Sequence, residues 1–201
     1  CLIPMVAKSL KIPVIAAGGI GTGRSMYAAL ALGADAVQIG SRFVASEESS
    51  AHQAFKNTVV EIQEGATQLT LKELAPVRLV KNKFYQDVAE AYANCATKED
   101  LIKVLGRARA KKGMFEGDLE EGELEIGQIA GLIHDIKPTA EIVKDMMKEY
   151  KDAKKNIAAM KKKYPKLIII PCSADSELAL REAAKAELID YIPGGDDFKI
   201  L

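Results

Sequence analysis

Small residues that could hold a phosphate group gather in two short stretches near the start of the chain. In AAGGIGTGR (16–24), Gly18 and Gly19 come directly after an apolar run. Glycine N–H groups can approach an anion closely, because no side chain is in the way. Gly40 and Ser41 follow a second apolar run and offer another N–H group and a hydroxyl. Together the two stretches predict a phosphate-binding site, although either one alone is also typical of a tight turn between a strand and a helix.

Two buried strands and a helix must position these loops. The runs IPVIAA (12–17) and AVQI (36–39) are typical of strands covered on both faces of a parallel sheet. The Ala-rich stretch 24–34 between them has helical spacing, and Gly33 is a suitable helix end. Strands joined by a helix run parallel, so both loops are expected at one edge of the sheet, together with the N-terminus of the helix that follows Gly23. In an α/β barrel this corresponds to the phosphate site after strands seven and eight.

The spacing of the glycines excludes two common nucleotide motifs. GGIGTG is not the Rossmann fingerprint, and no acidic residue follows at a second strand end to hold a ribose. The stretch also lacks the Lys–Ser/Thr pair of a P-loop. A mononucleotide or flavin phosphate in a barrel is therefore the favoured ligand.

The remaining chain is predicted to be mainly helical. The residue pattern indicates helices at 2–10, 47–64, 84–93, 97–105, 127–133 and 138–164, short strands or irregular structure at 67–82, a charged loop at 106–125, and a strand–helix–strand unit at 167–171, 175–188 and 189–192. On the long helix, one apolar row is expected to be buried: Val143, Met147, Tyr150, Ile157, Met160 and Tyr164. Because a two-stranded sheet is marginal alone, we expect the strands at 167–171 and 189–192 to join it and cover an edge.

Two segments resemble one flavoenzyme superfamily. Residues 12–49 (IPVIAAGGIGTGRSMYAALALGADAVQIGSRFVASEES) resemble the C-terminal barrel section of the nitronate monooxygenases, formerly 2-nitropropane dioxygenases, and equally that of the flavin-dependent class II enoyl-acyl-carrier-protein reductases. Residues 113–133 (GMFEGDLEEGELEIGQIAGLI) resemble the tail of the same superfamily. The resemblance covers roughly residues 1–150.

The resemblance implies an α/β fold, the C-terminal part of a TIM barrel (its last two strands) followed by a mostly helical region, and FMN as cofactor. Residues 1–56 would form the last barrel units, 57–150 the helical region, and 151–201 an unassigned extension. Matching positions would place Gly18, Gly19, Ile20, Gly40 and Ser41 at the FMN phosphate. Gln38, just inside the second strand end, and Gln128 would approach the flavin or the substrate.

The catalytic residue is not identifiable. The family's catalytic histidine lies upstream of the first phosphate loop, and neither His52 nor His134 matches it, so both are expected to be surface or helix-packing residues. Since a barrel has eight strands and the chain begins with Cys1 rather than Met, we expect a fragment of a longer enzyme. Arg78 and Asn82 are expected at the mouth of the pocket.

Three functions remain open. The first is an FMN-dependent oxidoreductase that oxidises alkyl nitronates with oxygen. The second is an NAD(P)H-dependent enoyl-acyl-carrier-protein reductase on the same scaffold. The third is a truncated, non-catalytic domain that binds phosphate. In the second case the basic stretch 107–112 could contact an acyl carrier protein or a dinucleotide phosphate, but it could also be an exposed loop neutralised by the acidic run 116–125.

The composition limits the partners. The 201 residues hold 28 Lys and Arg and 28 Asp and Glu, so a zero net charge favours neither nucleic acid nor an anionic membrane. No apolar run is long enough for a membrane span. Three separated cysteines without a C-x-x-C pair favour a reduced, cytoplasmic setting over a disulfide framework or a metal site. We expect a small-molecule substrate, with a homodimer as one oligomeric state.

Overall fold

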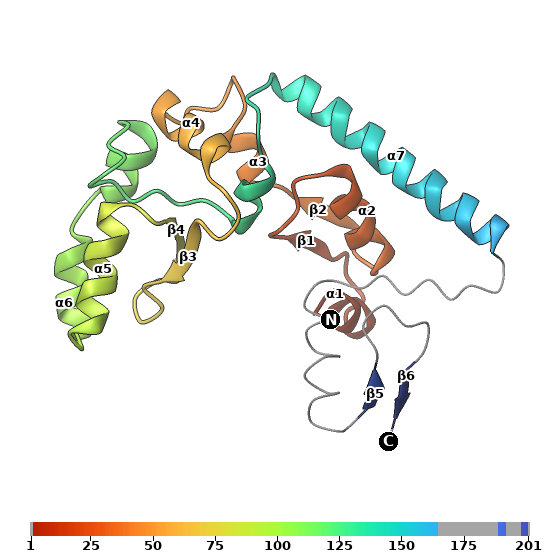
Figure 1. Ribbon diagram of the computed structural model, residues 1–201, viewed down its shortest axis with the longest axis horizontal. Helices are drawn as coiled ribbons and strands as arrows, with labels where there is room; N and C mark the ends of the chain where they lie inside the picture. Colours follow the sequence, from red (N-terminus) through yellow and green to blue (C-terminus); the bar gives the residue numbers. More distant parts are fainter. Residues whose placement is uncertain (1, 165–188, 192–197, 201) are drawn as a thin grey trace. The chain divides into compact units, whose positions relative to one another are not determined.

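The computed structural model describes residues 2–164, 189–191 and 198–200 (Figure 1). It is an α/β structure that divides into two units, residues 1–157 and 158–201, which are described separately. Among the described residues, no helix combines the length and apolar character needed to cross a lipid bilayer.

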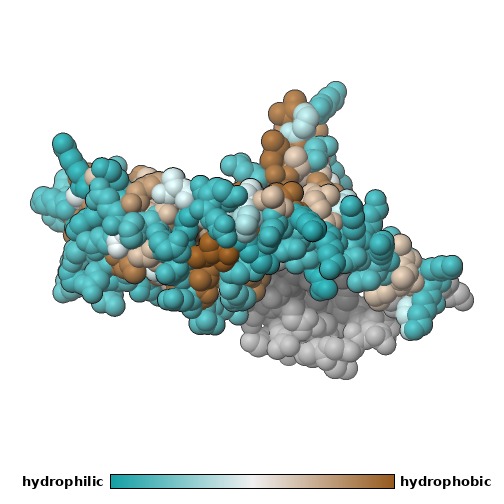
Figure 2. Space-filling model, turned by 90° about the horizontal axis from the view of Figure 1, so that it is seen from above, coloured by the Kyte–Doolittle hydropathy of each residue, from teal (hydrophilic) through white to brown (hydrophobic). Residues whose placement is uncertain are grey.

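The predicted strand–helix–strand unit is confirmed near the start of the chain. After α1 (Leu2–Ser9), strand β1 (Ile15–Ala17) lies parallel to β2 (Ala36–Gln38), and α2 (Gly23–Ala31) connects them. A reciprocal pair of hydrogen bonds between Thr22 and Ser25 caps α2. The core here consists of three alanines and Ile20. Several large apolar side chains remain exposed: Leu2, Met5, Ile12 and Ile15. Figure 2 shows brown, apolar areas on a face of the molecule that is mainly hydrophilic.

The chain after β2 differs from the prediction. A short helix, α3 (Ser41–Val44), begins where a loop was expected. The helix predicted at 47–64 is wrong at its start, because α4 (Gln53–Glu61) begins after His52, whose ring Nδ1 accepts the N–H of Ala54. The residues before it are held elsewhere, since the Glu48 carboxylate accepts the Thr139 N–H at 2.9 Å. That contact with a distant segment removes them from the helix.

A β-hairpin and two helices form the next part. Strands β3 (Thr67–Thr70) and β4 (Val77–Val80) pair antiparallel, and α5 (Lys83–Ala93) and α6 (Lys98–Leu105) follow as predicted. The free edge of β4 bonds the segment near residue 125, where Val80 donates to Leu124 and Ile126 donates to Arg78. The region predicted as a loop at 106–125 also contains a π-helical turn, η1 (Lys111–Phe115), and the helix expected at 127–133 is a 3-10 helix, η2 (Gln128–Leu132).

The long helix α7 (Thr139–Lys163) forms as predicted, but it buries a different face. Ile142 and Met146 are buried, whereas Val143 and Met147 of the predicted row are 46% and 37% exposed. The reason is a close backbone contact: a Cβ at Gly23 would lie 2.0 Å from the Met146 carbonyl oxygen. This contact with α2 determines which face of α7 is buried. The spacing of apolar residues along the helix does not determine it.

The end of the chain contradicts the expected sheet extension. Strand β5 (Ile189–Tyr191) pairs antiparallel with β6 (Phe198–Ile200), forming a sheet separate from β1 and β2. The six residues between these strands are too few for the crossover that parallel strands need. The prediction that 189–192 joins the first sheet is therefore wrong, and the segments predicted at 167–171 and 175–188 lie outside the described residues.

Candidate functional site

The two glycine loops lie at one edge of the parallel strand pair, and the space beside the glycines at the strand ends is free of atoms from the described residues. Ala17, the last residue of β1, pairs with Gln38, the last of β2, so the chain enters both loops at the same level. Gly18 and Gly19 have φ angles of +92° and +70°, which glycine adopts readily. A Cβ at Gly18, Gly19 or Gly40 would meet no atom within 4 Å. We call Gly18, Gly19, Gly40 and Ser41 the glycine cradle.

The cradle has hydrogen-bond donors to offer. Within the described part of the chain, no hydrogen bond uses the N–H group of Gly19 or Gly40. The Ser41 hydroxyl oxygen accepts the Gly127 N–H at 3.0 Å, so its own proton is left to donate. A Cβ at Gly127 would come within 2.6 Å of that oxygen, so a glycine is needed there. These groups are the type of donors that bind phosphate.

One cavity brings two of the predicted residues together. Gly19 and Gln128 line a hollow of about 310 Å³, and Glu64, Ile129, Gly131 and Leu132 complete its wall. Glu64 lies in the turn after α4, and no motif in the sequence predicts it as a site residue. Its place depends on Gly131, where a Cβ would be 3.2 Å from the Glu64 Cα.

The other predicted residues are placed less directly. The Ile20 side chain is buried among core alanines, so only its backbone can reach a ligand. Gln38 is exposed on β2 and is not among the residues lining the cavity that holds Gly19. Arg78 and Asn82 have structural partners: Arg78 donates to Thr67, and Asn82 caps α5 and bonds backbone carbonyls between 119 and 122.

Two backbone N–H groups in the first turn of α2 already have partners. The N–H of Gly23, the first residue of this helix, donates to the Glu149 carboxylate at 2.8 Å. The Ser25 N–H donates to the Thr22 hydroxyl. These two N–H groups are therefore not open for the anion contact expected at this helix end.

A second cavity, of about 180 Å³, lies on the α7 side of the glycine loop and is lined by charged groups. Arg42 pairs with Asp135, and Lys137 bridges Asp135 and Asp145 at 2.9 and 3.0 Å. Partial burial acts to raise the pKa of Asp135, but the hydrogen bond from Lys137 and the charge of Arg42 outweigh it and lower that pKa. His134 is exposed on the wall of this cavity, whereas the ring of His52 packs on Gly117, where a Cβ would be 2.3 Å from Nδ1.

The basic stretch 107–112 is largely neutralised. Arg109 pairs with Glu121 at 3.2 Å, Lys111 with Glu116 at 3.1 Å, and Lys112 with Asp118 at 2.9 Å. These ion pairs favour the neutralised-loop interpretation of this stretch over a docking surface for an acidic partner.

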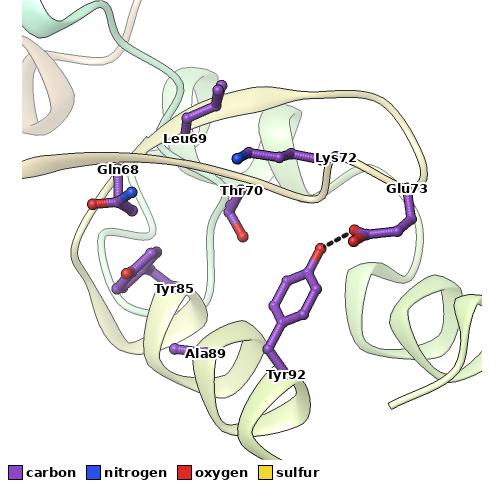
Figure 3. A pocket seen from close by; sticks show the side chains of 8 residues that line it. All are labelled: Gln68, Leu69, Thr70, Lys72, Glu73, Tyr85, Ala89 and Tyr92. Carbon is purple, nitrogen blue, oxygen red and sulfur yellow. Dashed lines mark hydrogen bonds between the residues drawn. The ribbon is translucent and has the colours of Figure 1, made fainter. Parts of the chain in front are cut away.

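A third cavity, of about 400 Å³, lies between the hairpin and α5 (Figure 3). Tyr85, Ala89 and Tyr92 line it from one helix face, and the Tyr92 hydroxyl donates to the Glu73 carboxylate. That hydrogen bond lowers the pKa of Glu73, while burial, followed by the same bond, raises the pKa of Tyr92. No residue of the glycine cradle lines this cavity.

The sequence model of the nitronate monooxygenase family matches residues 1–149, and the chain belongs to this family. It is 30% identical over 149 residues to a probable nitronate monooxygenase of Staphylococcus saprophyticus, a match that covers 74% of the chain and 41% of the relative. It is 32% identical over 155 residues to the nitronate monooxygenase of Paraburkholderia phytofirmans, covering 76% and 42%.

Solved structures extend the likeness. FabK from Thermotoga maritima is 39% identical with a TM-score of 0.70, and the match covers 79% of this chain and 50% of that one. The nitroalkane oxidase of Streptomyces ansochromogenes is 31% identical with a TM-score of 0.61, covering 78% and 44%. The chain thus spans about two fifths to one half of the length of these relatives.

A second family model matches the end of the chain. The G4 motif-containing domain of Obg-like GTPases (YGR210-like) matches residues 144–201, which include the extension at 151–201. The two matches overlap at 144–149, inside α7.

Proposed function

We propose that this chain is the phosphate-binding C-terminal part of a flavin-dependent oxidoreductase of TIM-barrel type, with β1 and β2 as the last two barrel strands. The observation that carries the proposal is the glycine cradle, where two parallel strand ends present open backbone donors on one side. Membership of the nitronate monooxygenase family supports the same assignment.

The residues of the cradle fit an FMN phosphate. Side chains at Gly18, Gly19 or Gly40 would fill the space that a phosphate needs, and none is present. The N–H groups of Gly19 and Gly40 and the Ser41 hydroxyl would hold the phosphate oxygens. Gln128 and Glu64, which line the adjoining cavity, would contact the rest of the cofactor or the substrate. Bound flavin would supply the redox chemistry, and the protein binds and orients it.

The proposed reaction is oxidation of alkyl nitronates with oxygen. The alternative is reduction of an enoyl-acyl-carrier-protein substrate by NADH or NADPH, and the 39% identity with FabK from Thermotoga maritima favours it. Assays of the purified protein separate the two. Rapid flavin reduction by NADH or NADPH with turnover of a crotonyl carrier substrate would overturn the nitronate assignment, and nitronate turnover without such reduction would support it.

Cofactor binding is tested on the 201-residue chain by flavin fluorescence. We expect stoichiometric FMN, and we expect Gly40→Ala to weaken FMN binding about tenfold, because the new methyl group takes up cradle space without a protein clash. Ser49→Ala, outside the cradle, is the control and should bind FMN normally. Unchanged affinity in Gly40→Ala would remove the cradle from the site, and no FMN on the native chain would favour the non-catalytic alternative.

A further inference from the structure

The first glycine loop, which carries Gly18 and Gly19 of the cradle, is held from two sides by distant parts of the chain. On one side, a Cβ at Gly21 would lie 2.7 Å from the Ile129 side chain of η2. On the other side, a Cβ at Gly23 would lie 2.0 Å from the Met146 carbonyl oxygen and 2.5 Å from the Tyr150 nitrogen, both in α7. The backbone of α7 therefore rests directly on the residue where the loop becomes helix α2.

A single polar bond anchors this contact. The Glu149 carboxylate accepts the Gly23 N–H at 2.8 Å, across 126 positions of sequence. A carboxylate is favourable there, because a helix N-terminus carries a partial positive charge. The neighbouring Tyr150 ring meets Tyr27 of α2 edge to face, with 5.6 Å between ring centroids. Glu149 is thus the charged group that joins α7 to the end of the glycine loop.

We propose that Glu149 is a positioning residue for the cofactor phosphate, an inference that rests on the proposed flavin-binding function. Its bond to Gly23 fixes the far end of the loop whose near end carries Gly18 and Gly19. Its negative charge lies at the N-terminus of α2. Without that charge, this helix end would compete with the cradle for the anion. The phosphate is therefore directed to Gly19, Gly40 and Ser41.

The bond and the charge of Glu149 have opposite effects on anion affinity. The bond stiffens the loop and favours binding. The charge repels a phosphate, because the carboxylate is bound at Gly23, four positions after Gly19 in the same loop. The repulsion is partly screened, because Glu149 is exposed and because the cavity beside it holds the cations Arg42 and Lys137 along with the carboxylates Asp135 and Asp145. Removing the charge alone should therefore have a small effect, and removing the bond a larger one.

Two substitutions separate these effects. Glu149→Gln keeps an oxygen that can accept the Gly23 N–H but removes the charge, and Glu149→Ala removes both. Asp152→Asn is the matched control, because it removes one exposed carboxylate of α7 that has no ion pair among the described residues. FMN affinity of the full chain is measured by fluorescence in low salt and in 0.5 M NaCl. Hydrogen exchange of residues 18–25 is measured without FMN.

We expect Glu149→Ala to bind FMN about tenfold more weakly and to exchange faster at 18–25. Glu149→Gln should keep the native exchange and bind FMN about twofold to fivefold more tightly in low salt, a gain that 0.5 M NaCl removes. Affinity changes of the same direction in both variants, or native exchange in Glu149→Ala, would overturn the role of Glu149. Absence of FMN binding by the native chain would instead overturn the proposed function, and the exchange measurement would still decide whether Glu149 positions the loop.

Discussion

Two neighbouring parts of this chain are stabilised in different ways. The hairpin part (residues 67–105) contains a core of large side chains, and Leu79, Phe84 and Val88 are completely buried in it. The parallel part (residues 2–44) has a core of alanines with Ile20, while Ile15 of its first strand is 61% exposed. Burial of large apolar side chains stabilises the hairpin part, and the parallel part buries much less apolar surface.

The parallel part gains its order from distant polar contacts. Ser41 accepts from Gly127, Arg42 donates to the Asp135 carbonyl, and Gly23 donates to Glu149, across 86, 93 and 126 positions of sequence. All three contacts lie at the edge where the strands end in the glycine cradle. The part of the molecule that carries the candidate site is therefore held by the segments after residue 126, and its own core contributes less.

The largest expected effect is in the hairpin core. Phe84→Ala removes a fully buried ring that also lies 4.8 Å from the Arg109 guanidinium carbon, and we expect the free energy of unfolding to fall by about 3–5 kcal/mol. Ile15→Ala, at the exposed strand, should change it by less than about 0.5 kcal/mol. Urea unfolding followed by circular dichroism measures both. Similar losses of unfolding free energy at the two positions would show that Ile15 is covered in solution. The two parts would then not differ in apolar burial.

The second prediction tests the backbone contact between α2 and α7. In Gly23→Ala the added methyl group meets backbone atoms of α7, which cannot rotate away, so we expect a loss of about 2–3 kcal/mol. In Gly40→Ala the methyl group meets no protein atom, and the stability should stay within about 0.5 kcal/mol. Thermal unfolding of the pair checks this, and a stable Gly23→Ala protein would contradict the contact.

The third prediction concerns a buried acid beside the hairpin. Burial, followed by the charge of Glu125, raises the pKa of Glu123 from its ordinary 4.5 to about 6. The folded state then holds this proton more tightly than the unfolded state, so the free energy of unfolding falls as pH rises from about 4.5 to 6 and stays lower above that. Glu123→Gln should remove this fall and raise the stability at pH 7 by about 1–2 kcal/mol.

The measurement is the difference in unfolding free energy between variant and native protein from pH 4 to 8. Glu120→Gln, which removes an exposed carboxylate of the same segment, serves as the control. If the difference in unfolding free energy for Glu123→Gln does not change with pH, the Glu123 carboxylate is hydrated in solution. The dense packing of the hairpin part would then not extend to this segment.

Local patterns were sufficient to predict the parallel part up to the cradle, although not the short helix α3 that begins at Ser41. The runs at 12–17 and 36–39, the glycines after them and the helix between them each depend on near neighbours in sequence, so β1, α2, β2 and the cradle could all be located. Helices α5 and α6 follow the same rule, because their caps Asn82 and Thr97 are local signals.

Contacts between distant residues could not be predicted. The buried face of α7 depends on the approach of Gly23, and the cavity position of Glu64 depends on Gly131. The start of α4 depends on the bond between Glu48 and Thr139, 91 positions apart. None of these pairs leaves a periodic pattern, and the same is true of Glu149, which the sequence shows only as one more acid on a charged helix.

The smallest effect is expected at two helix caps, one in each part, that have the same pattern of hydrogen bonds. Thr97 and Asp100 cap α6 in the hairpin part, as Thr22 and Ser25 cap α2 in the parallel part. Each threonine-to-alanine change should cost about 1 kcal/mol. In Thr97→Ala the pKa of Asp100, which hydrogen bonds from Thr97 and Lys103 hold at about 2, should rise toward its usual value in an NMR titration.

The two parts should differ in how far the damage spreads. Faster hydrogen exchange in Thr97→Ala should stay within α6, because the core below it is complete. In Thr22→Ala it should extend to the middle of α7, because Glu149 and Met146 rest on the first residue of α2. Exchange that stays local in both variants would mean that α7 does not depend on the glycine loop, and the parallel part would then be as self-sufficient as the hairpin part.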